Sequence, residues 1–301
     1  MNHIPASALA AHPAPPCPPP DPYPRAPSRF AVPAGAVDCH AHVIGQPPAH
    51  PFVDERSYTP PVAPEPAYLE MLDRTGMANG VLVQVSVHGT DNRLMLQTLR
   101  RQPGRLRGIA VMPLGLPAAE YEAARDAGVV GLRLNVLYGG GIGLSQLADY
   151  GALARELGWH LQLLVDARTL EPYAQTLAAL PVPVVIDHMG HYPAREGIDG
   201  PGVRTMLSLL ADGAWVKLSG AYRLDSAPWQ HILPLAQACL DAAPTRCVWG
   251  SDWPHVAHWD RMMNVAELLD LLADWVPDPE AREQVLVHNP RRLYGFTGNT
   301  P

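Results

Sequence analysis

Two histidines, His40 and His42, follow a short apolar run that begins at Val37. Successive side chains of a β-strand point to opposite faces, so a strand here would place both imidazoles on the same face. Two imidazoles side by side at a strand end can bind a metal ion or hold a substrate oxygen. Each would need a polar partner once buried, so neither is an obvious core residue. The pair therefore indicates a functional site at the end of a first strand.

Eight apolar, β-branched runs alternate with amphipathic stretches from residue 37 onward, as expected for a parallel sheet covered on both faces. The predicted strands are 37–44, 80–86, 106–112, 129–136, 160–166, 182–188, 214–219 and 247–252. The predicted helices are 66–73, 91–101, 118–127, 147–157, 170–180, 202–212, 229–242, 261–275 and 279–287. Gly128 and Gly158 stand where a left-handed residue commonly ends a helix. Eight strand–helix units over about 260 residues predict an α/β fold, the (β/α)₈ TIM barrel.

A doubly wound sheet is the alternative fold. It would carry a glycine-rich phosphate-binding turn after its first strand, but this chain has His40-Ala-His42 there. The glycine-rich segment Gly139–Gly143 lies well past a strand end, so it is not such a turn. It is interpreted as a flexible active-site loop.

Composition limits the classes of function. The 301 residues are 47% hydrophobic, which is enough for one large domain or two small ones. A net charge of -7 gives no reason to expect nucleic acid or an anionic membrane as partner. No apolar run approaches the roughly 20 residues that span a bilayer. The four cysteines form no C-x-x-C pair, which argues against zinc-ribbon and thioredoxin-like sites, and so few fit a reducing cytoplasm.

The N-terminal segment 1–33 holds eleven of the 34 prolines. Such a composition favours extended, solvated chain, so a flexible arm is expected before a single barrel domain at 34–301. A basic region followed by an apolar one is missing from it, which argues against a secretory signal peptide. A ligand for an SH3-like partner is the sharper but less supported alternative.

In a TIM barrel the site lies at the carboxyl ends of the strands. Several side chains able to bind or transfer protons are predicted there: His40, His42, Ser86, His88, Arg133, His188, Tyr222, Arg223, Asp252 and His255. Other polar residues near strands have a structural interpretation, as caps, ion-pair partners, barrel-bottom or solvated loop residues: His160, Asp166, Asp187, His191, Lys217 and His258. Arg133 could be a structural ion-pair partner too, because a buried arginine must find an anion.

Four motifs resemble the amidohydrolase superfamily, and more narrowly its amidohydrolase-2 branch of sugar and pyrone lactonases: Asp38–His42, Ile186–Gly190, Gly250–His255 and His288–Gly295. Three further segments resemble the 2-pyrone-4,6-dicarboxylate lactonases of that branch: Gln84–Asn92, Gly131–Asn135 and Ser219–Arg223. The resemblance covers about residues 36–296. It implies a hydrolase that opens a carboxylated lactone during degradation of aromatic compounds.

The resemblance also implies roles for the matched residues. Asp252 would activate water as the general base and later protonate the leaving ring oxygen. Three histidines would stabilise the oxyanion, namely His40, His42 and His188. Arg133 and Arg223 would hold two substrate carboxylates, a task that suits the guanidinium fork. The remaining pocket residues would be Ser86, His88, Tyr222 and His255.

Metal dependence stays open at this stage. Many amidohydrolases carry two divalent ions bridged by a lysine or carboxylate of the fourth or fifth strand. The fifth strand here has no lysine and the fourth offers Arg133, so a binuclear site is not expected. A single zinc has acceptable ligands in His40, His42, His188 and Asp252. The pyrone lactonases that the chain resembles work without an ion, so no cofactor is favoured.

Other functions on the same scaffold remain alternatives. They are a sugar-acid or sulfomuconolactone lactonase, a lactone isomerase and a zinc-dependent decarboxylase. A non-catalytic binding protein is disfavoured, because a binder has no need of a poised base. The expected partner is a small carboxylated lactone in the cytoplasm, with neither nucleic acid nor membrane.

Overall fold

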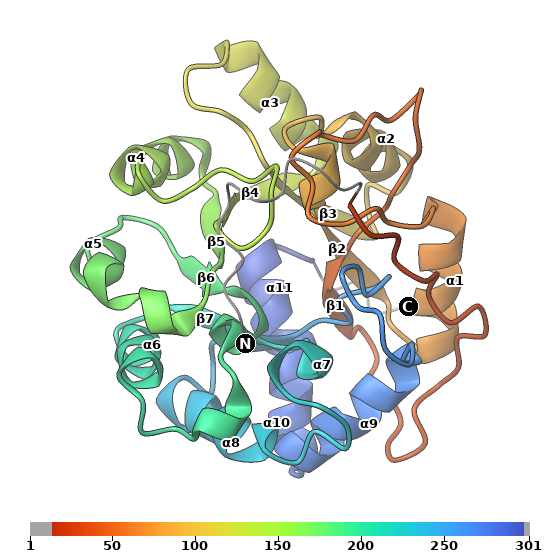
Figure 1. Ribbon diagram of the computed structural model, residues 1–301, viewed down its shortest axis with the longest axis vertical. Coiled ribbons are helices and arrows are strands. Elements are labelled where there is room, and N and C mark those ends of the chain that lie inside the picture. Colours follow the sequence, from red (N-terminus) through yellow and green to blue (C-terminus); the bar gives the residue numbers. More distant parts are fainter. Residues whose placement is uncertain (1–13, 298–301) are drawn as a thin grey trace.

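Eight parallel strands pair in sequence order and form a barrel that is ringed by helices (Figure 1). The structure is a computed structural model, and it describes residues 14–297. The strands are β1 Val37–Ala41, β2 Asn79–Val83, β3 Leu106–Ala110, β4 Val129–Asn135, β5 His160–Leu164, β6 Val184–Ile186, β7 Trp215–Leu218 and β8 Cys247–Trp249. The predicted TIM barrel is confirmed, and the doubly wound alternative is wrong.

The longer helices each bury one face against the outside of the strands. They are α1 Glu65–Thr75, α2 Arg93–Arg101, α3 Ala118–Ala127, α4 Leu147–Leu157, α5 Ala174–Ala178, α6 Pro201–Ala211, α7 Ala221–Leu224, α8 Ile232–Ala242, α9 Val265–Trp275, α10 Pro279–Glu283 and α11 Asn289–Tyr294. Gly128 and Gly158 end α3 and α4 in the left-handed conformation, as predicted.

Several helix boundaries differ from the sequence prediction. The predicted helices 229–242 and 261–275 begin only at Ile232 and Val265. The segment 170–180 is not one helix, because short 3₁₀ turns with Pro172 among them precede the five-residue α5. The predicted helix 91–101 begins only at Arg93, and the Asp91 carboxylate just before it accepts hydrogen bonds from the backbone N–H and the guanidinium of Arg93. The chain also stays helical beyond residue 287, through a π-helical turn into α11, where Pro290 occupies the first turn and needs no N–H partner.

The predicted strands at 37–44, 80–86, 182–188 and 247–252 end too late. The last residues of these segments lie in loops or 3₁₀ turns just beyond the ladder, and these are the positions of the candidate polar side chains. The side chains are nevertheless brought to one end of the barrel, because the strands are parallel and in register.

The barrel closes between β8 and β1 through residues just past both strands. Ala41 forms a parallel bridge with Trp253. The Asp252 N–H donates to the His40 carbonyl at 2.7 Å, and the His42 N–H donates to the Trp253 carbonyl at 2.8 Å. The seam of the barrel and the predicted site therefore share the same backbone.

The amino end of the barrel is closed by an apolar cluster. Tyr294 of α11 and the following Phe296 pack there with Val37 and Val248 from the strands. The ring of Tyr294 lies 5.4 Å from that of His160, which is buried at this end. Figure 1 shows α11 across the middle of the strand ring. This end of the barrel is thus occupied by structural side chains.

Residues 14–33 lie against the barrel. Cys17 is buried there, and its N–H donates to the Thr59 carbonyl at 2.8 Å. Residues 1–13 are outside the described part, so the expected flexibility of the arm stays a prediction. Within residues 14–297, no helix combines the length and apolarity that crossing a membrane requires.

Candidate active site

Asp252 stands at the first turn after β8, and only one of its carboxylate oxygens is held. Its φ of 60° is unusual for a residue with a side chain. Its Oδ2 accepts hydrogen bonds from the Tyr222 hydroxyl at 2.7 Å and from Arg223 Nε at 2.6 Å. Its Oδ1 faces the Nε2 atoms of three histidines. Oδ2 therefore fixes the carboxylate, and Oδ1 is the oxygen left for chemistry.

The three histidines surround that oxygen. Their Nε2 atoms lie 3.8 Å (His40), 3.7 Å (His42) and 3.8 Å (His188) from Asp252 Oδ1, too far for direct hydrogen bonds. His42 Nδ1 lies 2.7 Å from the Val83 carbonyl, which can only accept, so Nδ1 carries the hydrogen. Nε2 of a neutral His42 therefore carries a lone pair. It faces Asp252 Oδ1, which is also a hydrogen-bond acceptor.

His188 is placed by an unusual backbone and a close glycine. Its φ is 49°, and its Nδ1 lies 2.8 Å from Ser219 Oγ. Gly220, with φ 69°, packs on the ring, since a Cβ there would lie 3.1 Å from His188 Nδ1. The absence of a side chain at Gly220 thus lets the loop after β7 hold the imidazole.

Charge states follow from burial and from neighbours. Burial raises the pKa of Asp252, but the positive charge of Arg223 outweighs burial and holds that pKa well below its usual range. Burial lowers the pKa of His40 to about 3, with a smaller contribution from Lys217. Burial also lowers the pKa of His42 and that of His188. Near neutral pH the site is therefore one carboxylate facing three neutral imidazoles.

A buried ionic network lies around Asp187. Its Oδ2 lies 3.5 Å from Arg133 Nη2 and accepts from Gln162 Nε2 at 3.0 Å. Its Oδ1 lies 3.2 Å from Lys217 Nζ and 3.3 Å from His40 Nδ1. Burial raises the pKa of Asp187, but the positive charges of Lys217 and Arg133 bring it well below the usual range. Asp187 is thus a counterion and not a cap, and Arg133 and Lys217 are both paired to it.

Arg223 serves Asp252 in this structure. Besides Nε on Asp252, its Nη1 donates to the Tyr138 hydroxyl at 3.2 Å and its Nη2 to the Val256 carbonyl at 2.9 Å. The Tyr222 hydroxyl, which donates to Asp252, also lies 3.2 Å from Nδ1 of His255. Three residues expected to bind substrate, Tyr222, Arg223 and His255, therefore form a shell around the Asp252 carboxylate.

Ser86 and His88, the two candidate site residues after β2, make different kinds of contact. Ser86 Oγ accepts from Asn135 Nδ2 at 3.0 Å, and Asn135 also binds the Tyr138 carbonyl, so Ser86 is connected to the neighbourhood of Arg223. Both ring nitrogens of His88 contact backbone groups of the segment 45–51. His88 therefore holds a loop, and its role in substrate binding stays a prediction.

Several residues outside the predicted set belong to the site. His191 is half-buried, its ring lies 5.3 Å from that of His188, and desolvation together with Arg223 lowers its pKa to about 3. Tyr138 meets Arg223 from the loop after β4. The sequence places Asp187, Lys217 and His191 near predicted strand ends but favours a structural interpretation for them, whereas nothing in it marks Tyr138. His258 stays outside, with its Nε2 on the Arg261 carbonyl at 3.3 Å.

A comparison with known families decides the relationship. The family model described as Amidohydrolase matches residues 37–296, which is the whole barrel. The chain belongs to the amidohydrolase family. The resemblance seen in the sequence motifs is confirmed.

Relatives of this amidohydrolase are similar over nearly their full length. It is 34% identical to 4-sulfomuconolactone hydrolase of Hydrogenophaga intermedia, covering 89% of this chain and 91% of the relative. It is 33% identical to 2-pyrone-4,6-dicarboxylate hydrolase of Comamonas testosteroni, covering 88% and 92%. The crystal structure of a probable 2-pyrone-4,6-dicarboxylic acid hydrolase from Acinetobacter baumannii with citric acid bound superposes with a TM-score of 0.78, at 30% identity, covering 87% and 100%. This amidohydrolase is a hydrolase acting on ester bonds.

Amidohydrolases often use a divalent metal ion, and this site has suitable donors. Ligand atoms of His40, His188 and Asp252 lie within 4.8 Å of one another, and all three residues are buried. Imidazole nitrogen and carboxylate oxygen are donors that zinc accepts. Nε2 of His40 is buried without a hydrogen-bond partner among the described residues. The donor set therefore fits a single divalent ion.

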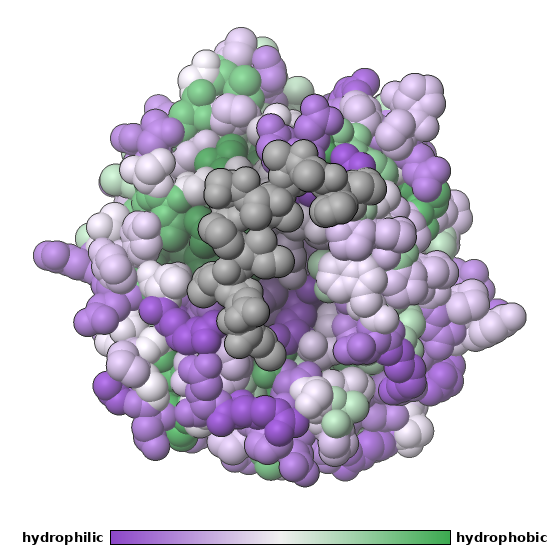
Figure 2. Space-filling view, in the orientation of Figure 1, coloured by the Kyte–Doolittle hydropathy of each residue, from purple (hydrophilic) through white to green (hydrophobic). Residues whose placement is uncertain are grey.

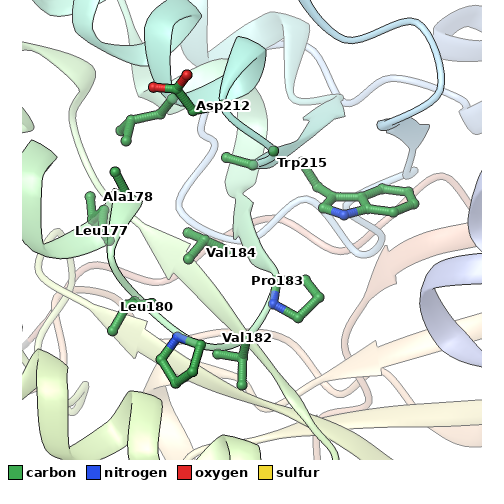
Figure 3. A pocket seen from close by; sticks show the side chains of 12 residues that line it. Leu177, Ala178, Leu180, Val182, Pro183, Val184, Asp212 and Trp215 are labelled. Atoms are coloured by element: carbon green, nitrogen blue, oxygen red, sulfur yellow. The ribbon is translucent and has the colours of Figure 1, made fainter.

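Two hollows lie away from these histidines. One, of about 950 Å³, is lined by apolar and charged residues including Val136, Leu144, Arg168 and Arg195. It lies among the loops that follow β4, β5 and β6, and Figure 2 shows apolar surface on this side of the molecule. The other, of about 320 Å³, lies between the starts of β6 and β7 near Trp215 (Figure 3). That is the amino end of the barrel, so it is remote from the site.

Proposed function

We propose that this protein opens the ring of a carboxylated lactone, a 2-pyrone-4,6-dicarboxylate-like compound, in the degradation of aromatic compounds. The observation that carries the proposal is the pair of acceptors formed by Asp252 Oδ1 and His42 Nε2, 3.7 Å apart. A water molecule has two hydrogens to donate, one to each acceptor. Its lone pair is then free for attack on a carbonyl carbon. The site thus orients and activates a nucleophilic water.

The carbonyl oxygen needs hydrogen-bond donors as it becomes an oxyanion. His40 and His188 stand on the other sides of Asp252 Oδ1 and supply Nε2 atoms to that space. A donor preorganised in a buried site is worth far more than one in water. His42 takes no part in this step, because its only ring hydrogen is on Nδ1 and is donated to the Val83 carbonyl.

The steps balance within the site. The water oxygen forms a bond to the carbonyl carbon, and Asp252 Oδ1 takes one water proton. The ring C–O bond then breaks, and Asp252 returns that proton to the leaving ring oxygen. The product is the open hydroxy acid or its enol. A carboxylate with a depressed pKa is always ionised at neutral pH, so it is ready to accept the proton.

The substrate carboxylates would be held at the barrel mouth. Nε of Arg133 is buried and has no hydrogen-bond partner among the described residues. An unpaired guanidinium N–H at that depth suits an anionic ligand. Arg223 would contribute through its outer nitrogens once the Tyr138 hydroxyl exchanges for a substrate oxygen. Ser86 would complete the pocket next to Tyr138.

We propose that the reaction needs no metal. Were a zinc ion bound, His40, His42, His188 and Asp252 would hold it, and it would polarise the carbonyl or lower the pKa of water. The water-orienting and oxyanion-binding roles derived above use protein atoms alone. A cytoplasmic location also stays a prediction.

The proposal is tested with a panel of lactones and with metal content measured in the same sample. Pyrone dicarboxylate is expected to give the highest kcat/KM, and a neutral sugar lactone the lowest. Protein that contains no metal should be active, and treatment with a chelator should not lower its activity. Preference for a neutral sugar lactone would contradict the carboxylated substrate class, and loss of activity on chelation would contradict the metal-independent mechanism.

Two alternatives give different outcomes in the same panel. A sulfonated muconolactone is also an anionic lactone, and the relative in Hydrogenophaga intermedia is named for it. If it is preferred, the ring-opening chemistry stands and only the substrate changes. Interconversion of two lactones without ring opening would indicate an isomerase. Release of carbon dioxide by a zinc-loaded protein would indicate a decarboxylase.

A further inference from the structure

Lys217 on β7 is a buried cation in contact with His40, and the mechanism above does not use it. The side chain is fully buried. Its Nζ donates to the Cys39 carbonyl at 2.9 Å and to Gln162 Oε1 at 2.8 Å. The third contact is with Nδ1 of His40 at 3.2 Å. Asp187 Oδ1 is a fourth neighbour of Nζ, an ion-pair partner at 3.2 Å, but it accepts no hydrogen bond from any described residue. An ammonium group has three hydrogens and no acceptor, so we assign them to the three hydrogen-bonded partners.

The contact with His40 decides where the hydrogen of that ring resides. Two groups compete for Nδ1, the Lys217 donor at 3.2 Å and the Asp187 acceptor Oδ1 at 3.3 Å. Only the lysine is oriented for a hydrogen bond, and Asp187 Oδ1 accepts none from any described residue. A neutral imidazole carries one N–H hydrogen. If Nδ1 of His40 accepts a hydrogen bond, that hydrogen must be on Nε2.

We propose that Lys217 is a positioning residue that fixes His40 in the Nε2–H tautomer. His40 thereby becomes an oxyanion donor, and its Nε2 lone pair is withdrawn from metal binding. The contrast with His42 supports this assignment, since Val83 holds that ring in the opposite tautomer. The inference rests on the proposed function, because it explains how a donor set that suits zinc supports a reaction without metal.

The unpartnered Nε2 of His40 agrees with the assignment. This atom is buried and has no hydrogen-bond partner among the described residues, while it points toward Asp252 Oδ1 at 3.8 Å. A donor left free in the resting site is ready for an oxygen that becomes negative only during the reaction. His42 and His40 thus divide the work, one accepting from water and the other donating to the carbonyl.

The direct test is the tautomer of His40 in ¹⁵N-histidine-labelled protein without substrate, read from long-range ¹H–¹⁵N correlations and assigned with His40→Gln. We expect Nε2–H in the wild type. In Lys217→Met we expect Nδ1–H, now donated to Asp187. Nδ1–H in the wild type, or an unchanged tautomer in Lys217→Met, would overturn the proposal. If Lys217→Met does not fold, the wild-type spectrum alone decides.

A second readout uses Co²⁺ as a probe of metal binding, followed by its visible absorption. Lys217→Met is expected to bind Co²⁺ at least about tenfold more tightly than the wild type, because the lone pair of His40 Nε2 becomes available. Arg133→Met is the matched control, since it removes a cation from the same Asp187 without touching His40. Equal gains in the two variants would show a charge effect only, and would contradict control of the tautomer.

Kinetics separates this inference from the proposed function. Loss of one oxyanion donor should lower kcat by roughly 10²-fold and leave KM nearly unchanged. His160→Asn, at the opposite end of the barrel, is the control for a general loss of buried polar contacts. If no lactone is hydrolysed by the wild type, the proposed function fails while the tautomer measurement still stands.

Discussion

Nε of Arg223 lies 2.6 Å from Oδ2 of Asp252, and both side chains are buried. The two side chains form a charge-assisted pair that leaves the other carboxylate oxygen, Oδ1, turned toward the histidines. An arginine that binds substrate and an arginine that positions Asp252 have different effects on kcat and KM when they are replaced. Kinetics can therefore determine the role of Arg223.

We expect Arg223→Met to lower kcat by roughly 10²-fold, because the carboxylate loses the partner that fixes its orientation. A residue that only binds a substrate carboxylate would instead raise KM with kcat unchanged. Steady-state kinetics on the best lactone of the panel separates these two effects. Arg168→Met is the matched control, since it removes an exposed arginine whose partners are Asp166 and Glu196. A change confined to KM would contradict the positioning role and leave Arg223 with substrate binding alone.

Asp252→Asn should bind substrate and fail to open it. The amide keeps the shape of the side chain but cannot take the proton, so a loss of kcat of roughly 10³-fold is expected, with a smaller effect on affinity. Binding is measured by calorimetry and turnover by the absorbance of the pyrone. Asp166→Asn is the control, as a carboxylate after β5 that pairs only with Arg168. Turnover like that of the wild type in Asp252→Asn would end the proposed mechanism.

Gly250→Ala tests the packing behind His40. A Cβ at this position would lie 2.7 Å from His40 Cβ and 2.8 Å from its backbone nitrogen, closer than real contacts allow. The first strand must therefore shift, and we expect at least a tenfold loss of kcat with destabilisation of about 1–3 kcal/mol. Gly143→Ala is the matched control, because a Cβ there meets nothing within 4 Å. Equal kinetics and urea midpoints for the two variants would contradict the expectation.

Asp38 predicts a pH dependence of stability. Its carboxyl accepts from the Ser251 hydroxyl at 2.7 Å and the Tyr68 hydroxyl at 3.1 Å, but burial raises its pKa from 3.8 to about 6. Because the pKa of Asp38 is higher in the folded than in the unfolded protein, the protonated carboxyl contributes its full stabilisation below pH 4. This stabilisation is lost as pH rises through 6. The upward shift of about 2 units corresponds to about 3 kcal/mol.

The comparison that isolates this group is the free energy of unfolding in urea for the wild type and Asp38→Asn between pH 4 and 7. An asparagine can accept from the backbone and donate to the two hydroxyls, and it does not titrate. The variant should gain about 3 kcal/mol relative to the wild type across this range. A constant difference between the two proteins would show that the Asp38 carboxyl has an ordinary pKa.

The barrel could be predicted from the sequence because each strand is a run of buried apolar residues and the apolar residues of each main helix recur at helical spacing. The boundaries could not, since the end of a strand depends on which backbone groups find partners in the neighbouring strand. His42 and Ser251 lie beyond their strands for this reason. Pro172 likewise interrupts a segment whose apolar spacing alone is helical.

The site was predictable where residue type and strand end coincide, as for His40, His188 and Asp252. The sequence could not predict which individual atoms form hydrogen bonds with one another. Spacing does not tell that Val83 takes the Nδ1 hydrogen of His42, or that the hydroxyl of Tyr138 reaches Arg223 from another loop. These contacts depend on the register of the strands and on positive φ angles, which single-residue preferences do not specify.

The seam between β8 and β1 has a consequence for folding. The hydrogen bond from the Asp252 N–H to the His40 carbonyl joins residues separated by most of the chain, so it forms only when the two ends of the sheet meet. Contacts of such high sequence separation carry the full entropy of loop closure and tend to form late. A nascent chain therefore has no catalytic centre until its eighth strand has been synthesised and docked. Hydrolytic activity should appear together with the final cooperative step of folding and would serve as its reporter.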